Sequence, residues 1–475
     1  MTHHVLIAGG GPSGLAAAAE LAHHGVASIV VEPRAEISWA RPRAKTTSAR
    51  TMELFRRWGV AEAVRRAAPL SAGWCRRVVF CDSLSGSVLT EFDDVFGLTA
   101  AEDGLAAESG QQVAQPVVET VLRDHLRAGG LADLRLGSRL VGFTASGEQV
   151  TGEIERADGS RYRVDVEYLL GCDGGRSTVR AGLGVELVGD SAPRANLNAV
   201  FRSKDLRPAL GDALHYWVLG ATVPGAVGPL DRDGTWWASF AGVGDFGSLI
   251  AGLLGSLTPD IELLSTDPWT PRMLLADRFA TDRVFLVGEA AHVNPPYGGH
   301  GFNTCVGDAV NIGWKVAAVL QGWAGPGLLA TYEPERRGVA EQTIASAVRN
   351  LRADLTPTTL QETKAEEFHS LGLVLGYSYG DPAPLDVRRY VPSTRPGARL
   401  PHTWVAPGHA LYDDLGRGFT LIGPPGPDVA ALAAAVPLTV LPGEGPYLLV
   451  RPDQHIAWRG HDLTAVDLKG LLSCG

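Results

Sequence analysis

The sequence contains little sulfur and few lysines. Its 475 residues include five cysteines and three methionines, and only five of its 42 Lys and Arg residues are lysine. The cysteines are far apart and form no CxxC pair, which argues against a disulfide framework and against a cysteine metal site. They are Cys75, Cys81, Cys172, Cys305 and Cys474. This pattern is typical of a reducing compartment, so we expect a cytoplasmic protein.

Long hydrophobic runs and an excess of basic charge are also absent. The sequence has no stretch of about 18 apolar residues, so it predicts no membrane span, and its start, MTHHVLIAGG, predicts no secretory signal. A net charge of −10 argues against nucleic acid as the main partner. With 45% hydrophobic and 20% charged residues, the composition is that of a globular protein, and the length predicts about two to four domains.

The N-terminal segment is typical of a strand, a turn and a helix. A short apolar strand, His4–Ala8, leads into glycines, the Ala-rich segment Leu15–His24 predicts a helix, and Ser28–Val31 predicts a second strand that Glu32 closes. Together these elements form a βαβ unit of about 30 residues.

The glycine spacing in this turn predicts a dinucleotide site. In Gly9-x-Gly11-x-x-Gly14, the first glycine permits a tight turn, the second lets the backbone approach a pyrophosphate, and the third lets the helix pack close to the strand. The N–H groups at the helix N-terminus, which begins with Pro12 and Ser13, favour phosphates. Glu32 is placed to accept hydrogen bonds from a ribose diol. This spacing does not distinguish NAD from FAD.

Two further motifs each follow an apolar strand. Tyr168–Gly171 precedes Asp173-Gly174, and Val284–Val287 precedes Gly288-Glu289 and the Pro- and Gly-rich segment Pro295–Asn303. Both motifs therefore lie at the carboxyl ends of strands, where doubly wound sheets bind ligands. The glycines at 298–301 let the backbone approach a ligand closely.

The remaining sequence predicts further elements. Helices are expected at Thr47–Arg66, Pro116–Leu126, Asp308–Leu320 and Leu328–Asp354, the last with Glu333, Glu335, Arg336 and Arg337 on a solvated face. Antiparallel strands are expected at 139–170 with a turn at Asp158-Gly159, and strands at His215–Leu219 and Thr235–Ala241. After a linker near residue 390, a small α/β module has predicted strands at Phe419–Ile422, Leu438–Leu441 and Tyr447–Val450 around a helix at 429–436.

These three ordered motifs resemble those of the single-component FAD-dependent aromatic hydroxylases, the p-hydroxybenzoate hydroxylase-like flavin monooxygenase family. The chain looks most similar to the subgroup with a C-terminal thioredoxin-like domain, which includes phenol hydroxylases and polyketide-tailoring oxygenases. The resemblance implies an α/β fold: a Rossmann-like FAD-binding domain, an inserted mixed β-sheet substrate domain and a thioredoxin-like α/β domain. We expect the FAD-binding domain at 1–180 and 281–390, the substrate domain at 181–280 and the C-terminal domain at 391–475.

The resemblance also implies cofactor-binding residues. For the ADP half of FAD they are Gly9, Gly11, Pro12, Ser13, Gly14, Glu32, Pro33 and Arg34. Arg41, Arg43, Gln115, Asp173 and Gly174 match positions near the pyrophosphate, the ribityl chain and the incoming nicotinamide cofactor. Gly288 precedes Glu289, which stands where the family normally has Asp and carries its carboxylate on one more methylene. For the loop around the isoalloxazine ring they are Pro296, Gly299, His300, Gly301, Phe302 and Asn303.

The implied reaction is hydroxylation of an aromatic or polyketide substrate in secondary metabolism. Non-covalent FAD would use NAD(P)H and O₂ and act through a flavin C4a-hydroperoxide. The aromatic segment Leu214–Phe240 is expected to form the pocket wall. Candidate catalytic residues are Tyr216 and His300, with Pro296 in the flavin loop. His215 is a further candidate base, but as strand neighbours His215 and Tyr216 point to opposite faces.

Three alternatives remain open from the sequence. The same flavin chemistry could carry out Baeyer–Villiger insertion or epoxidation. The first glycine motif alone would also fit an NAD-dependent dehydrogenase, and the Glu289 departure would fit a flavin-binding module without turnover. We predict no metal site, because the pairs His3-His4 and His23-His24 lack further ligands at suitable spacing. The expected partners are a small-molecule substrate and, as an open expectation, a second copy in a homodimer.

Overall fold

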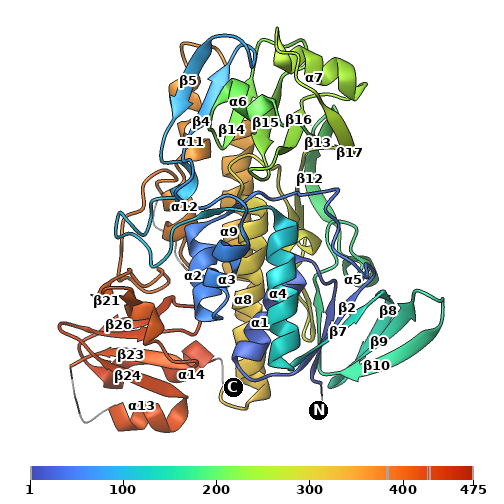
Figure 1. The fold of residues 1–475 in the computed structure, drawn as a ribbon. Helices are drawn as coiled ribbons and strands as arrows, with labels where there is room; N and C mark the ends of the chain where they lie inside the picture. Colours follow the sequence, from blue (N-terminus) through green and yellow to red (C-terminus); the bar gives the residue numbers. More distant parts are fainter. Residues whose placement is uncertain (1–2, 381–384, 425, 427–428, 473–475) are drawn as a thin grey trace.

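A five-stranded parallel sheet forms the base of the nucleotide-binding half (Figure 1). The structure is a computed structural model that describes residues 3–380, 385–424, 426 and 429–472, so Cys474 lies outside the described residues. In sheet order, the strands are β19 (Val284–Leu286), β11 (Tyr168–Gly171), β1 (Val5–Ala8), β2 (Ser28–Glu32) and β7 (Ala132–Leu136). Every neighbouring pair is parallel, which confirms the α/β fold and the N-terminal βαβ unit.

Both faces of the parallel sheet are covered, as buried parallel strands require. On one face α1 (Pro12–His23) packs against α4 (Gln115–Gly129) and α8 (His300–Leu320). On the other lies an antiparallel sheet of β8 (Ser138–Ser146), β9 (Gln149–Arg156) and β10 (Arg161–Val166). A Cβ on Gly152 of β9 would lie 2.5 Å from Leu6 Cδ2 on β1, so the two layers are in close contact.

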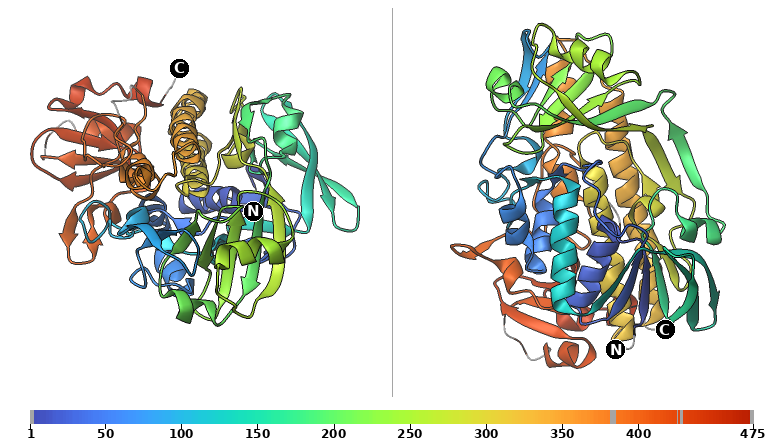
Figure 2. Two further views of the ribbon diagram at one scale, coloured as in Figure 1. Left: turned by 90° about the horizontal axis from the view of Figure 1, so that it is seen from above. Right: turned by 45° about the vertical axis from the view of Figure 1, so that its right-hand side comes forward.

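A seven-stranded sheet stands above the nucleotide-binding half (Figures 1 and 2). In sheet order, its strands are β17 (Glu262–Trp269), β13 (Asn196–Arg202), β16 (Thr235–Phe240), β15 (Gly225–Pro229), β14 (His215–Val218), β4 (Val78–Cys81) and β5 (Val88–Phe92). Its outer face packs on α7 (Phe246–Leu254). Because β4 and β5 come from the first part of the chain, the predicted segment 181–280 does not form this sheet alone.

Three predicted elements differ from the structure. The expected helix at Thr47–Arg66 is β3 (Thr46–Thr47) followed by α2 (Ala49–Arg57) and α3 (Ala61–Ala67). Gly59, at a φ of 76°, interrupts it, since that conformation is not helical. The expected antiparallel run 139–170 ends at Val166, because Tyr168–Gly171 is the parallel strand β11. α8 begins at His300, earlier than expected, so it takes up the end of the predicted flavin loop.

The C-terminal module has a four-stranded sheet in the order β24-β23-β25-β26. Its elements are β23 (Phe419–Gly423), α13 (Val429–Ala435), β24 (Leu438–Pro442), β25 (Tyr447–Val450) and β26 (Ile456–Gly460). The three predicted strands and the helix are confirmed. Its core is continuous with the end of α8, where the ring centroids of Trp314 and Phe419 are 6.4 Å apart.

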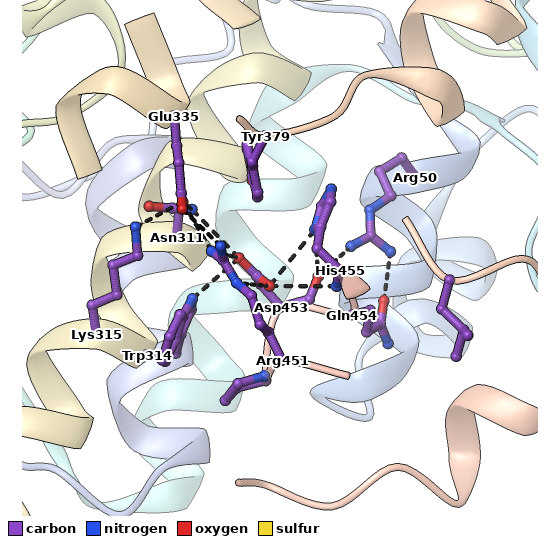
Figure 3. Close-up of polar contacts among 12 residues, drawn as sticks. Arg50, Asn311, Trp314, Lys315, Glu335, Tyr379, Arg451, Asp453, Gln454 and His455 are labelled. Atoms are coloured by element: carbon purple, nitrogen blue, oxygen red, sulfur yellow. Dashed lines mark hydrogen bonds and ion pairs between the residues drawn. The ribbon is translucent and has the colours of Figure 1, made fainter. Parts of the chain in front are cut away.

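A buried ionic network joins this module to α8 and α9 (Tyr332–Leu351) (Figure 3). Arg451 donates to both oxygens of Glu335, at 2.7 and 2.9 Å, and to Asp453 at 2.7 Å. Lys315 donates to Glu335 at 2.7 Å. Glu335 was expected on a solvated face, but it lies inside this junction because the module covers that side of α9.

Shorter elements connect these units. The remaining strands are β6 (Gln111–Gln112), β12 (Leu187–Ser191), β18 (Arg272–Ala276), β20 (His292–Val293), β21 (Trp404–Ala406) and β22 (His409–Ala410). The remaining α-helices are α5 (Thr178–Gly182), α6 (Leu206–Leu210), α10 (Leu360–Thr363), α11 (Ala365–Phe368), α12 (Leu371–Gly376) and α14 (Leu468–Leu472). None of the described helices combines the length and apolarity that a membrane span would need.

Candidate active site

Three glycines shape the turn between β1 and α1, and they do so differently. Gly9 has a φ of 99°, and a Cβ there would lie 2.4 Å from the carbonyl oxygen of Cys172. A Cβ on Gly14 would lie 1.8 Å from the carbonyl oxygen of Gly9. A Cβ on Gly11 would instead meet nothing closer than Arg34 Nη2, 3.9 Å away. The space beside Gly11 is therefore free for a ligand such as a pyrophosphate.

The N-terminus of α1 opens onto this space. Gly11 is its N-cap, no side chain accepts a hydrogen bond from its first turn, and Pro12 occupies a first-turn position. The first-turn N–H groups, including that of Ser13, are thus left without a side-chain acceptor and carry the partial positive charge of the helix end. This arrangement suits a phosphate.

Glu32 holds the turn through its carboxylate at the end of β2. It is 3% exposed, and it accepts the N–H of Gly10 at 2.8 Å on one oxygen. Its other oxygen accepts the N–H and Nε of Arg34, at 3.0 and 2.6 Å. A carboxylate has about four lone-pair sites, so Glu32 keeps capacity for a ribose diol. Pro33 is exposed beside it.

A second polar group faces Arg34 from α4. Gln115 donates to Glu119 at 2.7 Å, and the other oxygen of Glu119 lies 3.6 Å from Arg34 Nη2. Two guanidinium nitrogens of the buried Arg123 have no hydrogen-bond partner, as is expected beside a ligand or a water site. Glu119 and Arg123 were not predicted, although they follow Gln115 at intervals of four residues, which places all three on one helix face.

The Asp173-Gly174 motif and Glu289 meet where β11 and β19 end. Asp173 accepts hydrogen bonds from Ser177 Oγ at 2.5 Å and from the N–H of Thr178 at 2.6 Å, so its side chain holds the start of α5. Burial raises the pKa of Asp173, against these hydrogen bonds. The exposed carboxylate of Glu289 lies beside Gly174, 3.9 Å from the position of a Cβ there. The parallel pairing of the strands thus brings Gly174 and Glu289 together, and Gly288 leads into this turn at a φ of 65°.

The flavin-loop motif forms a tight turn before α8. Gly298 and Gly299 have φ angles of 86° and 70°, and the N–H of Gly299 donates to the carbonyl of Pro296 at 3.1 Å. Gly299 is the N-cap of α8, and no side chain caps this helix. A second uncapped helix N-terminus therefore opens on the nucleotide-binding half.

The first turn of α8 contains the other predicted loop residues. His300 is buried, and its Nε2 has no hydrogen-bond partner. Burial lowers its pKa to about 4, so the imidazole is neutral near pH 7. A Cβ on Gly301 would lie 3.3 Å from Asn294 Nδ2, whereas Phe302 packs against the core of the nucleotide-binding half.

Asn303 joins the flavin loop to the segment that begins at β3. Its side-chain oxygen accepts the N–H of Ser48 and the hydroxyl of Thr51, both at 2.8 Å. Its amide nitrogen donates to the carbonyls of Gly299, at 2.8 Å, and Thr46, at 3.2 Å. With both amide groups engaged, the side chain of Asn303 positions the loop.

Asp308 supports the same turn from inside α8 and was not predicted as a site residue. It accepts hydrogen bonds from Arg336 at 2.7 Å and from the N–H of Gly288 at 3.2 Å, and it lies 2.6 Å from His292 Nε2. Burial opposes its ionisation, but Arg336 and His292 outweigh burial and lower the pKa of Asp308. Arg336, expected on a solvated face, is 1% exposed.

The inner face of the seven-stranded sheet lies opposite the flavin loop. Trp217 stacks on Tyr297, with centroids 6.3 Å apart and planes 27° apart. His215 lies edge-on to Trp237 at 5.7 Å, and the ammonium of Lys45 is 4.2 Å from the centroid of the Trp237 ring. The His215 Nε2 and the indole nitrogens of both tryptophans have no hydrogen-bond partner. We call these five residues the aromatic chamber.

The structure does not bring Tyr216 to this chamber. Its side chain points to the opposite face of β14, into the core that α7 covers. Its hydroxyl donates to the carbonyls of Leu210 and Gly211, both at 3.1 Å. Burial raises the pKa of Tyr216, so its hydroxyl stays protonated at neutral pH and is not available to accept a proton.

Arg41 and Arg43 lie beside β13 and β16 of the seven-stranded sheet. Both line a cavity shared with Lys45 and Trp237. Arg41 is paired with Asp267 at 3.0 Å, and Arg43 has a φ of 44°, which is rare for a residue other than glycine. The ion pair of Arg41 is thus made with the seven-stranded sheet and not with the glycine turn.

The sequence and the structure of this chain are both similar to those of known FAD-binding proteins. A model of the FAD binding domain family matches residues 2–242 and 248–347. Aklavinone 12-hydroxylase RdmE of Streptomyces purpurascens is 32% identical over 518 residues, covering 97% of this chain and 96% of the relative. A putative polyketide hydroxylase of Streptomyces halstedii is 34% identical over 434 residues, covering 85% of this chain and 77% of the relative.

A solved structure of RebC, soaked with chromopyrrolic acid and holding 7-carboxy-K252c, superposes with a TM-score of 0.90 at 33% identity. The match covers 99% of this chain and 98% of RebC. FAD would occupy the free space at Gly11 and lie against the two helix N-termini that no side chain caps. A substrate would offer partners to the polar atoms that have none in the protein. The chain therefore belongs to the FAD binding domain family and is an FAD-dependent monooxygenase of the aromatic hydroxylase type.

Proposed function

We propose that this monooxygenase hydroxylates a multi-ring phenol of the polyketide type, bound in the aromatic chamber. The observation that carries the proposal is the stack of Trp217 on Tyr297, which places flat side chains and unpartnered polar edges directly beside the flavin loop. The polyketide hydroxylases among its relatives support this class of substrate.

The chain's own residues have distinct roles in this proposal. Gly11, Glu32 and the N-terminus of α1 hold the ADP half of the cofactor, and Glu289 with the N-terminus of α8 holds the flavin half. FAD bound by these residues and reduced by NAD(P)H would supply the chemistry that activates O₂, so that one oxygen atom of O₂ would enter the substrate and the other would leave as water. The dipole of α8 stabilises negative charge near Gly299, and the aromatic chamber excludes water.

His215 is placed in the chamber but is a weak base. Burial, assisted by the charge of Lys45, lowers its pKa to about 3, so the ring is neutral at physiological pH. A neutral imidazole both donates and accepts hydrogen bonds, so His215 orients a substrate hydroxyl. His300, with a pKa of about 4, is neutral as well.

The test combines cofactor content, turnover and isotope labelling. The purified protein is expected to hold FAD and to oxidise NADPH or NADH faster when a polycyclic phenol is added. With ¹⁸O₂, one labelled oxygen should appear as a phenolic hydroxyl of the product. A colourless protein, or oxidation that no phenol stimulates, would contradict the proposal. A label inserted into a ring as an ester, or placed in an epoxide, would assign Baeyer–Villiger or epoxidase chemistry instead.

Two further expectations from the sequence belong to this proposal. We propose a cytoplasmic location, which cell fractionation tests, and a homodimer, which light scattering of the FAD-loaded protein tests. The division into a FAD-binding domain, a substrate domain and a thioredoxin-like domain also stays a prediction, which limited proteolysis tests.

A further inference from the structure

The buried side chain of Arg336 connects α8 with the C-terminal part of the chain. Each of its three guanidinium nitrogens donates a hydrogen bond. Two of these bonds go to α8, from Nε to Asp308 at 2.7 Å and from Nη2 to the carbonyl of Thr304 at 3.2 Å. The third goes from Nη1 to the hydroxyl of Tyr379, at 3.3 Å. This buried cation therefore has one of its acceptors outside α8, on Tyr379.

Tyr379 is held in place by the C-terminal module. Its ring lies on that of His455, with centroids 4.3 Å and planes 33° apart, and the guanidinium carbon of Arg451 is 4.9 Å from its centroid (Figure 3). The N–H of Tyr379 donates to the carbonyl of Gly397 at 3.0 Å, and the N–H of Gly397 donates to Ile456 in β26 at 2.7 Å. The module thus fixes both the main chain and the buried side chain of Tyr379.

At its other end, the guanidinium of Arg336 acts on the cofactor site through Asp308. The second carboxylate oxygen of Asp308 accepts the N–H of Gly288 at 3.2 Å, so the direction of this carboxylate holds the turn that carries Glu289. The same turn lies against the first turn of α1, because a Cβ on Gly288 would overlap Ser13 Oγ. A chain of hydrogen bonds therefore runs from the C-terminal module through Arg336 and Asp308 to the turn at Gly288.

We infer that Tyr379 is a positioning residue for FAD: it orients Arg336 and Asp308, and so couples the docked C-terminal module to the cofactor-binding turn. Without the hydroxyl, the buried Nη1 of Arg336 loses its acceptor, and the guanidinium tilts to regain one. Asp308 turns with it, so the N–H of Gly288 is held less well. A change in the module thereby weakens FAD binding without altering a residue of the turn. The inference rests on the proposed placement of the flavin half beside Glu289, and not on the substrate or the reaction.

The test compares two Tyr-to-Phe variants, each of which removes one acceptor from a buried arginine. Tyr379→Phe removes an acceptor of Arg336. Tyr390→Phe is the matched control, because Arg399 donates from Nη1 to the Tyr390 hydroxyl at 3.0 Å but is paired with Glu53, which lies outside the cofactor turn.

The FAD-loaded proteins are diluted, and the fluorescence of the released flavin gives the dissociation constant of FAD. We expect Tyr379→Phe to weaken FAD binding about tenfold, as the loss of a hydrogen bond to a charged group implies. Tyr390→Phe should leave the dissociation constant within about twofold of wild type. The melting temperatures at saturating FAD establish that both variants are folded.

A double-mutant cycle tests whether Tyr379 acts through Arg336. Arg336→Gln should weaken FAD binding at least as much as Tyr379→Phe, and adding Tyr379→Phe to it should have no further effect, whereas independent effects would multiply. An unchanged dissociation constant in Tyr379→Phe, an equal loss in Tyr390→Phe, or a multiplied loss in the double variant would overturn the inference. The two Phe variants decide it even when Arg336→Gln does not fold. Phenol-stimulated NAD(P)H oxidation at saturating FAD tests the proposed function separately.

Discussion

Single glycines in the first turn have separate physical requirements. Gly9 and Gly14 are required by the chain itself, because a Cβ at either position would overlap backbone atoms. Gly11 has no such constraint, since its nearest neighbour would be the end of the Arg34 side chain at 3.9 Å. The space around each glycine therefore agrees with the separate roles predicted from the motif, and only Gly11 is explained by a ligand.

We expect Gly11→Val to fold and to lose FAD. The added side chain would occupy the space beside the N-terminus of α1, so FAD affinity should fall at least about tenfold, while the melting temperature of the apoprotein should change little. Gly14→Ala is the matched contrast. It should destabilise the apoprotein by about 1–3 kcal/mol, because a Cβ there forces the helix away from the strand. Apoprotein melting and FAD titration check both variants, and equal effects on the apoprotein would contradict this separation.

Tyr216→Phe should leave catalysis nearly unchanged. The hydroxyl bonds only to carbonyls on the far side of the sheet, so its removal should lower the free energy of unfolding by about 1 kcal/mol. The kcat measured with the best phenol found should stay within about twofold of wild type. A loss of kcat of a hundredfold or more would show that Tyr216 reaches the substrate after all.

At the scale of elements, the sequence predicted those helices and strands whose apolar pattern and turn residues lie within the element itself. The βαβ unit, β14, β16 and the strands of the C-terminal module follow from apolar runs and turn residues, and the structure confirms them. The break at Gly59 was visible as a glycine but lay within a continuous amphipathic pattern. The inward faces of Glu335 and Arg336 could not be predicted, because the groups that bury them, Arg451 and Asp308, lie elsewhere in the sequence.

In the site, too, some features could be predicted from local motifs and others depend on the packing of distant segments. Its glycine turns and the meeting of Gly174 with Glu289 follow from motifs at strand ends. Lys45 and the chosen face of β14 do not, because they depend on the packing of β3 and the flavin loop against a sheet formed from distant segments.

The junction of the C-terminal module with α9 depends on Glu335 (Figure 3). Glu335→Gln would leave Arg451 and Lys315 without their shared carboxylate, so we expect the free energy of unfolding to fall by about 3–5 kcal/mol. Glu262→Gln, which removes an exposed partner of Arg202, should cost less than about 1 kcal/mol. Urea denaturation of both variants measures the difference, and similar losses would contradict the importance of burial here.

At the scale of the whole molecule, buried carboxylates govern stability in acid. Arg57 and His24 lower the pKa of Glu20 to about 2, and Arg451 and Lys315 lower that of Glu335 to about 2, in both cases against burial. The ordinary value is 4.5. Because the folded-state pKa values are depressed, the unfolded chain takes up protons first as the pH falls.

Stability should therefore be fully present above about pH 4.5 and decline as the pH falls from there toward 2. Each carboxylate contributes up to about 3 kcal/mol over this range. Glu20→Gln and Glu335→Gln should each flatten the dependence of the unfolding free energy on pH between 2 and 4.5. Chemical denaturation at a series of pH values measures it, and unchanged slopes would show that other groups control acid unfolding.

The strand order of the central sheet has a consequence for synthesis on the ribosome. β11 ends at Gly171, but its outer neighbour β19 begins only at Val284, after the chain has passed through most of the upper sheet. Until then β11 is an exposed edge strand of the nascent chain, and its free backbone groups can pair with other chains. The FAD site is therefore completed late, when β19 joins the sheet. We expect a fragment that stops before Val284 to aggregate and to bind no FAD.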